Sequence, residues 1–279
     1  MSRYGKWTEK RISRFENEGR GKGLGASYRP WIEVNDFSSQ GDSRRVFSPL
    51  TNRTHHLLSN IEFNFFVLAE FTPDILDIRE QYPLDRAQTR TIAVELGIRH
   101  PQYLGTQVDT VMTCDFLITR ERDGMKTLEA YNCKPSYEAN QNRSIEKLEI
   151  QRRYFEGCDI PHFLVFDEML PVTKIRNIKW IRDGCLFERE IEPQPDYYFD
   201  HCRRLLNDIT QVTRQDSLAN YCTRYDERAG ALPGTALRVV RMLLRQRLLV
   251  TDLNQPDLHN SPISMFKRPQ PHLRSVGRV

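Results

Sequence analysis

Residues 108–135 read VDTVMTCDFLITRERDGMKTLEAYNCKP, which is two apolar runs separated by Asp123 and Gly124. Asp-Gly is typical of a tight hairpin turn, because the turn requires a positive φ that Gly adopts freely and Asp tolerates. We therefore predict two antiparallel strands joined at this dipeptide. Asp115 lies inside the first apolar run, and Asn132 and Lys134 lie two residues apart near the end of the second.

The segments on either side of this hairpin complete the predicted core. Upstream, Ser59 can cap an apolar helix, NIEFNFFVLAEF, and DILDIREQYPL predicts a strand ended by Pro83. Downstream, SIEKLEIQRRYFEG predicts a helix ended by Gly157, and IPHFLVFDE predicts a buried strand. This order predicts an α/β fold, with a mixed sheet that carries helices on its faces.

The sequences before and after this core differ from it in composition and in the secondary structure that they predict. A short basic helix runs to Gly19 and is followed by the glycine-rich strip GRGKGLG. No K-[ST] follows this strip, as it would in a nucleotide-binding loop, so we interpret it as a basic loop along a phosphate backbone or as a linker. After Pro171, three predicted helices and a short strand, LLVTDL, are typical of a smaller winged-helix-like domain.

We place the boundary between the two domains between Glu168 and Pro195. The predicted organisation has four parts, listed in chain order: a basic N-terminal helix and glycine-rich segment packed on the core (1–53), the α/β core that would carry the active site (54–170), a helical winged-helix-like domain (171–253) and a basic, proline-containing tail (254–279). We expect the tail to be extended or disordered.

Composition limits the classes of function. The chain has 279 residues, of which 39% are hydrophobic and 28% charged, which excludes collagen-like and wholly disordered proteins. No apolar run is long enough to span a membrane, and the six cysteines form no C-x-x-C pair, so we expect a cytoplasmic protein without disulfides or zinc. The net charge of +4 does not by itself prove a nucleic-acid partner.

Glu62, Asp115 and Lys134 are charged residues within apolar elements. A charge in such a place is costly unless it is paired or bound to a metal ion. One interpretation is a structural ion pair between Asp115 and Lys134. The other is a magnesium site, in which hard oxygen ligands hold the cation and the lysine serves the water that attacks phosphorus.

This order of a helical Glu, a strand Asp and a polar-x-Lys on the paired strand resembles the PD-(D/E)xK nuclease superfamily. More closely, the chain resembles the TnsA family of transposase endonuclease subunits. The matching text, over about residues 10–170, is GRGKGLGASYRPW, THHLLSNIEF, ILDIREQYPL, TCDFLI, NCKPS and SIEKLEIQRRYFE. The resemblance implies a restriction-endonuclease-like fold.

The resemblance also implies roles for individual residues. Glu62 and Asp115 become metal ligands, and Lys134 becomes the catalytic lysine. Asn132 stands where the superfamily usually has an acid, so either its side chain or the main-chain carbonyl of Cys133 would be a further ligand. Two nearby acids, Glu80 and Glu149, could lie in the shell around the metal ligands, or each could be a solvated or salt-bridged side chain.

Basic residues in two segments are candidates for DNA or partner contacts. Arg20 and Lys22 belong to the glycine-rich strip. Arg238, Arg241 and Arg245 recur at spacings of three and four and share one face of a predicted helix. That face could read DNA, be solvated or dock an acidic partner, and the family favours docking to the ATPase TnsC.

The function implied by the resemblance is a Mg²⁺-dependent endonuclease, with Mn²⁺ able to substitute. It would cut the non-transferred strands at the 5′ ends of a transposon, in partnership with a TnsB-like DDE transposase and a TnsC-like AAA+ ATPase. Its expected location is the bacterial cytoplasm, at the nucleoid when bound to DNA. The alternatives are a stand-alone restriction or junction-resolving nuclease and an inactive DNA-binding assembly factor.

Overall fold

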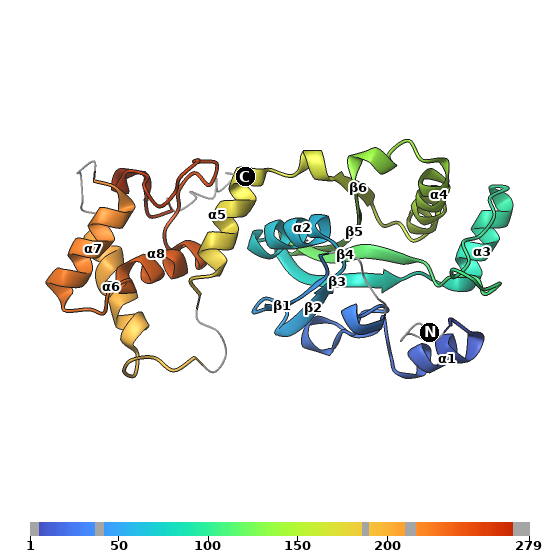
Figure 1. The fold of residues 1–279 in the computed structure, drawn as a ribbon, viewed down its shortest axis with the longest axis horizontal. Coiled ribbons are helices and arrows are strands. Elements are labelled where there is room, and N and C mark those ends of the chain that lie inside the picture. The colour runs from blue at the N-terminus through green and yellow to red at the C-terminus, as the bar shows by residue number, and fades with distance from the viewer. Residues whose placement is uncertain (1–5, 37–41, 186–189, 210–215, 270–279) are drawn as a thin grey trace, which may run out of the picture. The chain divides into compact units, whose positions relative to one another are not determined.

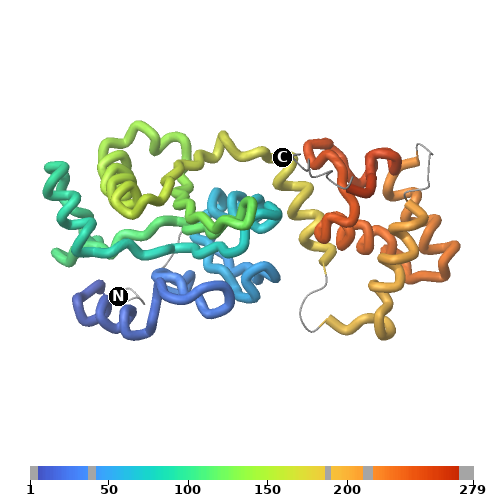
Figure 2. The backbone as a smooth tube through the Cα atoms, turned by 180° about the vertical axis from the view of Figure 1, so that it is seen from behind, coloured from blue at the N-terminus to red at the C-terminus, as the bar shows by residue number. Residues whose placement is uncertain are grey.

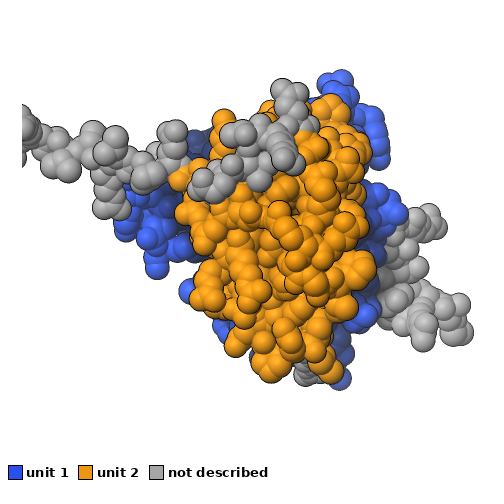
Figure 3. Space-filling view, turned by 90° about the vertical axis from the view of Figure 1, so that its left-hand side faces the viewer, with its two compact units in different colours: residues 1–170 blue, residues 171–279 orange. Residues whose placement is uncertain are grey.

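The computed structural model describes residues 6–36, 42–185, 190–209 and 216–269. The chain divides into two compact units, residues 1–170 and 171–279, which are coloured separately in Figure 3. The first unit combines a sheet with helices and the second is helical (Figure 1). The predicted fold class, a mixed sheet flanked by helices and followed by a helical region, is confirmed.

Four strands form the sheet of the first unit, in the order β3-β4-β5-β6. They are Ile75–Pro83, Thr113–Arg122, Met125–Lys134 and His162–Phe166. The first three are antiparallel, whereas β6 runs parallel to β5. The predicted hairpin is confirmed, since Asp123 and Gly124 join β4 to β5 with φ values of 51° and 77°.

Helices α2 and α4 were both predicted and are both present. α2 (Asn60–Phe71) begins after Ser59, whose Oγ accepts a hydrogen bond from the N–H of Glu62. α4 (Asn142–Gly157) provides the crossover that the parallel strands β5 and β6 require. Both helices are labelled in Figure 1.

A third helix, α3 (Arg86–Glu95), lies between β3 and β4 and packs against α4. Asp85 caps it by accepting a hydrogen bond from the N–H of Gln88 (2.8 Å). The sequence analysis missed this helix because only Thr89 and Ala93 are buried in it, so it has almost no apolar stripe.

The prediction that the last strand is buried is wrong. In β6 only Val165 is buried, while Phe163 and Leu164 are 44% and 37% exposed. Within the described residues only β5 pairs with β6, so the strand lies at the edge of the sheet. An apolar run such as HFLVF cannot by itself distinguish an edge strand from a central one.

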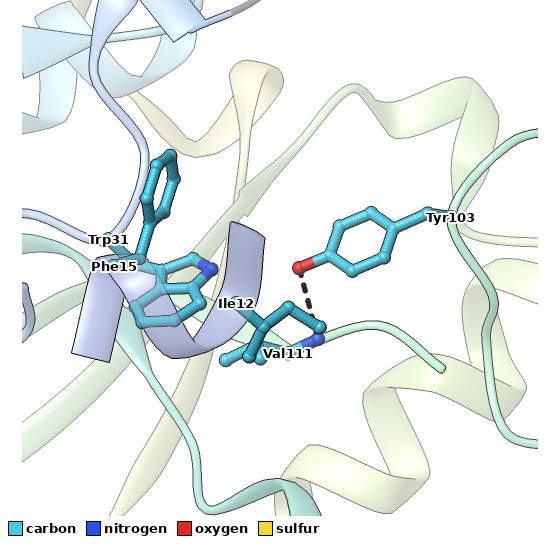
Figure 4. Packing of buried hydrophobic residues seen from close by; sticks show 5 residues of the cluster. All are labelled: Ile12, Phe15, Trp31, Tyr103 and Val111. Atoms are coloured by element: carbon cyan, nitrogen blue, oxygen red, sulfur yellow. Dashed lines mark hydrogen bonds between the residues drawn. The ribbon is translucent and has the colours of Figure 1, made fainter. Parts of the chain in front are cut away.

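The N-terminal helix α1 (Glu9–Asn17) ends just before Gly19, as predicted. Its buried side chains join residues from distant segments in the cluster of Figure 4, which contains Ile12, Phe15, Trp31, Tyr103 and Val111. The hydroxyl of Tyr103 accepts a hydrogen bond from the N–H of Val111 (3.2 Å). Opposite views show α1 and α4 on different sides of the sheet (Figures 1 and 2).

An antiparallel hairpin that was not predicted, β1 (Arg44–Ser48) and β2 (Arg53–Leu57), is anchored to the sheet by Glu80. Arg53 donates through Nη1 to Oε1 of Glu80, and Nδ1 of His55 lies near Oε2, both at 2.8 Å. Burial alone would raise the pKa of Glu80, but electrostatic interactions and hydrogen bonds with His55 and Arg53 outweigh it and hold the pKa below its ordinary value.

The second unit contains four helices in its described part. They are α5 (Val172–Arg182), α6 (Tyr197–Ile209), α7 (Leu218–Ala229) and α8 (Thr235–Arg245). The last three were predicted and are confirmed, and α8 packs against the other three helices. No helix in the described part of the chain is long and apolar enough to cross a membrane.

Two expectations for the end of the chain are wrong. The segment LLVTDL forms no strand in the described residues, and Val250 makes only an isolated bridge with Lys267. Residues 254–269 are not a loose tail, because Leu258, Ile263 and Phe266 are almost completely buried. These spaced apolar side chains give the proline-containing segment a core to pack into, which its composition did not reveal.

We predict that Glu80→Gln lowers the free energy of unfolding by about 3–5 kcal/mol, because it leaves Arg53 buried and charged without its partner. Urea unfolding measures the loss, and Glu95→Gln, at an exposed position of α3, should behave as wild type. Because folding lowers the pKa of Glu80, its stabilisation is present at neutral pH and declines below about pH 4.3, so the two proteins should converge in acid. A loss below about 1 kcal/mol would contradict the anchoring role.

Candidate active site

Glu62 is held by the terminus of the helix that carries it. Its Oε1 accepts a hydrogen bond from the hydroxyl of Ser59 (3.0 Å), and its Oε2 accepts one from the N–H of Leu58 (2.9 Å). Ser59 in turn accepts a hydrogen bond from the N–H of Glu62 (3.1 Å). The sequence pattern is that of a capping box, Ser-x-x-Glu, but the carboxylate binds the N–H of Leu58 and the hydroxyl of Ser59 instead of the N–H of Ser59. These bonds hold the carboxylate in a buried position.

Asp115 and Lys134 come from the paired strands β4 and β5. The register places Phe116 opposite Tyr131, so Asp115 stands opposite Asn132 in the same pairing. The Oδ2 of Asp115 accepts a hydrogen bond from the N–H of Cys133 (2.7 Å). The backbone of β5 therefore holds the carboxylate that β4 supplies.

Glu62, Asp115 and Lys134 interact electrostatically. Burial, and then the negative charge of Asp115, raises the pKa of Glu62, although Lys134 acts in the opposite direction. The charge of Asp115 also raises the pKa of Lys134 and outweighs the effect of burial, so this lysine keeps its proton at neutral pH. Within the described residues no ion pair joins Asp115 directly to Lys134, so these two side chains do not form the simple structural pair considered above.

The donor set fits a divalent cation. The raised pKa of Glu62 means that the protein does not fully compensate two buried carboxylates, and a cation between them would do so. Carboxylate oxygens are ligands that Mg²⁺ prefers, often completed by water and substrate phosphate. The described residues contain no group of three or more His, Cys, Asp or Glu side chains placed to hold a metal ion. Other ligands would have to be amide, main-chain, water or substrate oxygens.

The side chain of Asn132 already has a partner. Its Oδ1 lies 2.7 Å from Nε2 of His162, on the neighbouring strand β6. Burial lowers the pKa of His162 to about 4, so the ring is neutral at pH 7 and Nε2 donates to the amide oxygen. A ligand role for Asn132 would need the second lone pair of that oxygen. The other predicted ligand, the carbonyl of Cys133, belongs to the residue whose N–H binds Asp115.

Glu80 and Glu149, the two acids that could lie in the shell around the metal ligands, each have an arginine partner. Glu80 is engaged by Arg53 and His55 of strand β2 in the β1-β2 hairpin. Glu149, on α4, forms an ion pair with Arg152 at 2.8 Å, and this hydrogen bond lowers the pKa of Glu149. Their contacts are those of salt-bridged side chains, which was the alternative interpretation for both residues.

The basic residues of the glycine-rich strip differ in exposure. Arg20 is only 6% exposed, donates to Asp36 and Glu18, and lies over the ring of Phe15 at 3.6 Å from its centroid. Its guanidinium therefore supports the N-terminal segment. Lys22 is exposed and can reach a partner.

Two of the three arginines on α8 hold the second unit together. Arg238 donates to the carbonyl of Gly184 (3.2 Å) and pairs with Glu190, and Arg241 donates to the carbonyl of Trp180 (2.6 Å). Arg245 is half-buried at the end of the helix. The face that carries Arg238 and Arg241 thus contacts neighbouring segments of its own unit.

Sequence reasoning named Ser59 only as a helix cap, and it missed two other side chains at the site, His162 and Gln81. Ser59 had a readable signal, because Ser-x-x-Glu before an apolar run is a capping box as well as a helix start. His162, which binds Asn132, and Gln81, which lies near Glu62, had no signal of their own. Their roles depend on strands that are distant in sequence.

We predict that Ser59→Ala and Ser217→Ala each lower the free energy of unfolding by about 1 kcal/mol, because each removes a helix cap. Ser217 caps α7 by accepting a hydrogen bond from the N–H of Asn220 (3.2 Å). Only Ser59→Ala should also weaken Mn²⁺ binding in calorimetry, since only Ser59 holds the carboxylate of Glu62. Equal Mn²⁺ affinity in the two variants would show that Ser59 does not contribute to metal binding.

Comparison with known proteins identifies both units. Residues 72–167 match the model of the TnsA-like endonuclease N-terminal domain, and residues 170–253 match that of the TnsA endonuclease C-terminal domain. Asp115 and Lys134 lie within the first match and Glu62 lies outside it.

The Transposon Tn7 transposition protein TnsA of Escherichia coli is 43% identical over 176 residues, which is 63% of this chain and 63% of the length of that relative. The two domain models match consecutive parts of the chain, and they describe the N-terminal and the C-terminal domain of TnsA-type endonucleases. On this agreement of both domain models with the Tn7 relative, the chain belongs to the TnsA endonuclease family.

Proposed function

We propose that this chain is a Mg²⁺-dependent DNA endonuclease of PD-(D/E)xK type, acting as a subunit of a Tn7-type transposase. Its reaction would be hydrolysis of the non-transferred strands at the 5′ ends of the transposon. The observation that carries this proposal is the buried pair Glu62 and Asp115 beside the protonated Lys134. The membership in an endonuclease family and the name of the Tn7 relative support it.

Each residue has a distinct task in the proposed reaction. Glu62 and Asp115, with an oxygen from Asn132 or from the main chain of Cys133, would hold Mg²⁺, or Mn²⁺ in its place. When bound, the cation would polarise the scissile phosphate and lower the pKa of its water. Lys134, as a cation, orients the attacking water and offsets the negative charge that develops on the phosphate.

The chemistry balances as a simple hydrolysis. The water oxygen attacks phosphorus, the bond from phosphorus to the 3′ oxygen breaks, and the water proton goes to solvent while the leaving oxygen is protonated. The products are a 5′-phosphate and a 3′-hydroxyl. The N–H of Leu58 and the hydroxyl of Ser59 hold Glu62, and the N–H of Cys133 holds Asp115, so both carboxylates are in place before substrate arrives.

We further propose that specificity for the transposon ends comes from partners, a TnsB-like DDE transposase and a TnsC-like AAA+ ATPase. The net charge is only +4, and Arg20, Arg238 and Arg241 are engaged inside their own units. The remaining basic surface supports modest, salt-sensitive contacts with duplex DNA, which position the protein without reading sequence.

We predict that Asp115→Asn and Lys134→Ala each reduce cleavage by about 100-fold or more, because metal and lysine act as one unit on one phosphate. Asn retains an oxygen that can accept from the N–H of Cys133, so the fold should survive, which circular dichroism checks. Lys126→Ala, at an exposed position of the same strand, is the control and should cut as wild type. Cleavage near the wild-type rate by either site variant would show that the site is elsewhere.

We predict that the isolated chain does not cut transposon ends specifically at physiological salt, and that adding the DDE transposase and the ATPase restores specific nicking. Gel analysis of end-containing DNA with Mg²⁺ measures this. Specific cutting without partners would instead identify a stand-alone nuclease. No cutting under any combination, together with retained binding to the partners, would identify an inactive assembly factor.

A further inference from the structure

Gln81 has an unusual backbone conformation for its place in the fold. It lies within β3, yet its φ is +48°, in the left-handed region that a side chain with a Cβ rarely adopts. Four of the other five described non-glycine residues with a positive φ are Asn or Asp, which tolerate this region. A left-handed Gln costs about 1–2 kcal/mol, so a Gly would be easier to accommodate there.

The side chain of Gln81 connects β4 to Glu62. It is buried, and its Oε1 accepts a hydrogen bond from the hydroxyl of Thr113 (3.2 Å). Its Nε2 faces Oε2 of Glu62 at 3.5 Å, the long end of the hydrogen-bond range. The neighbouring pairs in β3 and β4 place Gln81 opposite Asp115.

Its backbone is also fixed, which determines where the side chain points. The carbonyl of Gln81 accepts a hydrogen bond from the N–H of Trp31 (3.2 Å), in the N-terminal segment that packs along this side of the sheet. Trp31 thus binds the backbone of Gln81 in its left-handed conformation, and the side chain of Gln81 contacts Thr113 and Glu62.

We propose that Gln81 is a positioning residue for the candidate metal site, and that its left-handed backbone serves to direct the amide N–H toward the carboxylate of Glu62. The inference rests on the proposed function, in which Glu62 is a metal ligand. The hydroxyl of Thr113 sets the orientation of the amide, because an amide turned the other way would place its oxygen against the carboxylate.

The residue type suits this task. A neutral amide donates to a carboxylate without supplying the positive charge that a divalent cation must bring. A Lys or Arg in its place would compete with the cation, and a Glu would add a third negative charge to the two that already repel each other. Hydrogen bonds to metal ligands of this kind typically change metal affinity by about 10- to 100-fold.

The test separates the side chain from the backbone. Gln81→Asn and Gln81→Gly both relieve the strain of a positive φ, which offsets the loss of the buried hydrogen bonds, so both should fold with a melting temperature near that of wild type. Asn is one methylene shorter and cannot span from Thr113 to Glu62, and Gly has no side chain. Both variants should raise the Mn²⁺ concentration for half-maximal cleavage about tenfold and weaken Mn²⁺ binding in calorimetry equally, while cleavage recovers at saturating metal.

A third test variant and a control complete the experiment. Thr113→Val removes only the hydroxyl that orients the amide and should shift the Mn²⁺ dependence in the same direction but less. Asn52→Gly makes a comparable backbone change at an exposed left-handed position in the β1-β2 turn, and should leave the Mn²⁺ dependence unchanged.

The outcomes are distinguishable from failure of the proposed function. An inactive wild type that binds no Mn²⁺ would overturn the function itself. An active wild type whose Mn²⁺ dependence is unchanged in both Gln81→Asn and Gln81→Gly would overturn the positioning role alone. A marked loss of melting temperature in Gln81→Asn, with unchanged Mn²⁺ affinity, would assign Gln81 to the fold and also overturn it.

Discussion

Two carboxylates, those of Glu62 and Asp115, are buried near each other without a cation of their own to neutralise both. The surrounding structure is arranged to hold them in that position. A helix cap and the N–H of Leu58 bind Glu62, and the backbone of β5 binds Asp115. All of these donors are neutral, so they fix the oxygens in place without compensating the negative charge, and the pKa of Glu62 stays raised. Lys134 offsets part of this negative charge, and a divalent cation can offset the rest.

The contrast between Glu62 and Glu80 shows how the neighbours of a buried acid determine its role. Both are buried, but burial is overcome at Glu80 by Arg53 and His55, which lower its pKa, whereas at Glu62 the nearby Asp115 adds to the effect of burial and raises it. Glu80 therefore serves as an anchor that joins the β1-β2 hairpin to the sheet. Glu62 remains poorly compensated, which is typical of functional rather than structural acids.

The role of the arginines in the second unit also depends on their neighbours in the folded structure. Arg238 and Arg241 look like a basic surface when the helix is considered alone, because they share one face of α8. In the folded unit, carbonyl groups of the neighbouring residues Gly184 and Trp180 accept their hydrogen bonds. A charged stripe on a helix can therefore be part of the packing of its own domain, since guanidinium groups satisfy main-chain acceptors at the ends of adjacent helices.

The sequence alone determined the local features of this protein. Asp123-Gly124 predicted the β4-β5 hairpin and Ser59 predicted the start of α2, because turn and cap preferences depend on a few adjacent residues. The same hairpin brought Asp115, Asn132 and Lys134 into one candidate site. Only the tertiary structure decided that β6 is an edge strand, that Glu80 pairs with Arg53, and that Gln81 and His162 contact site residues. Each of these depends on strand order or on partners far apart in the chain, and neither is encoded in a local pattern.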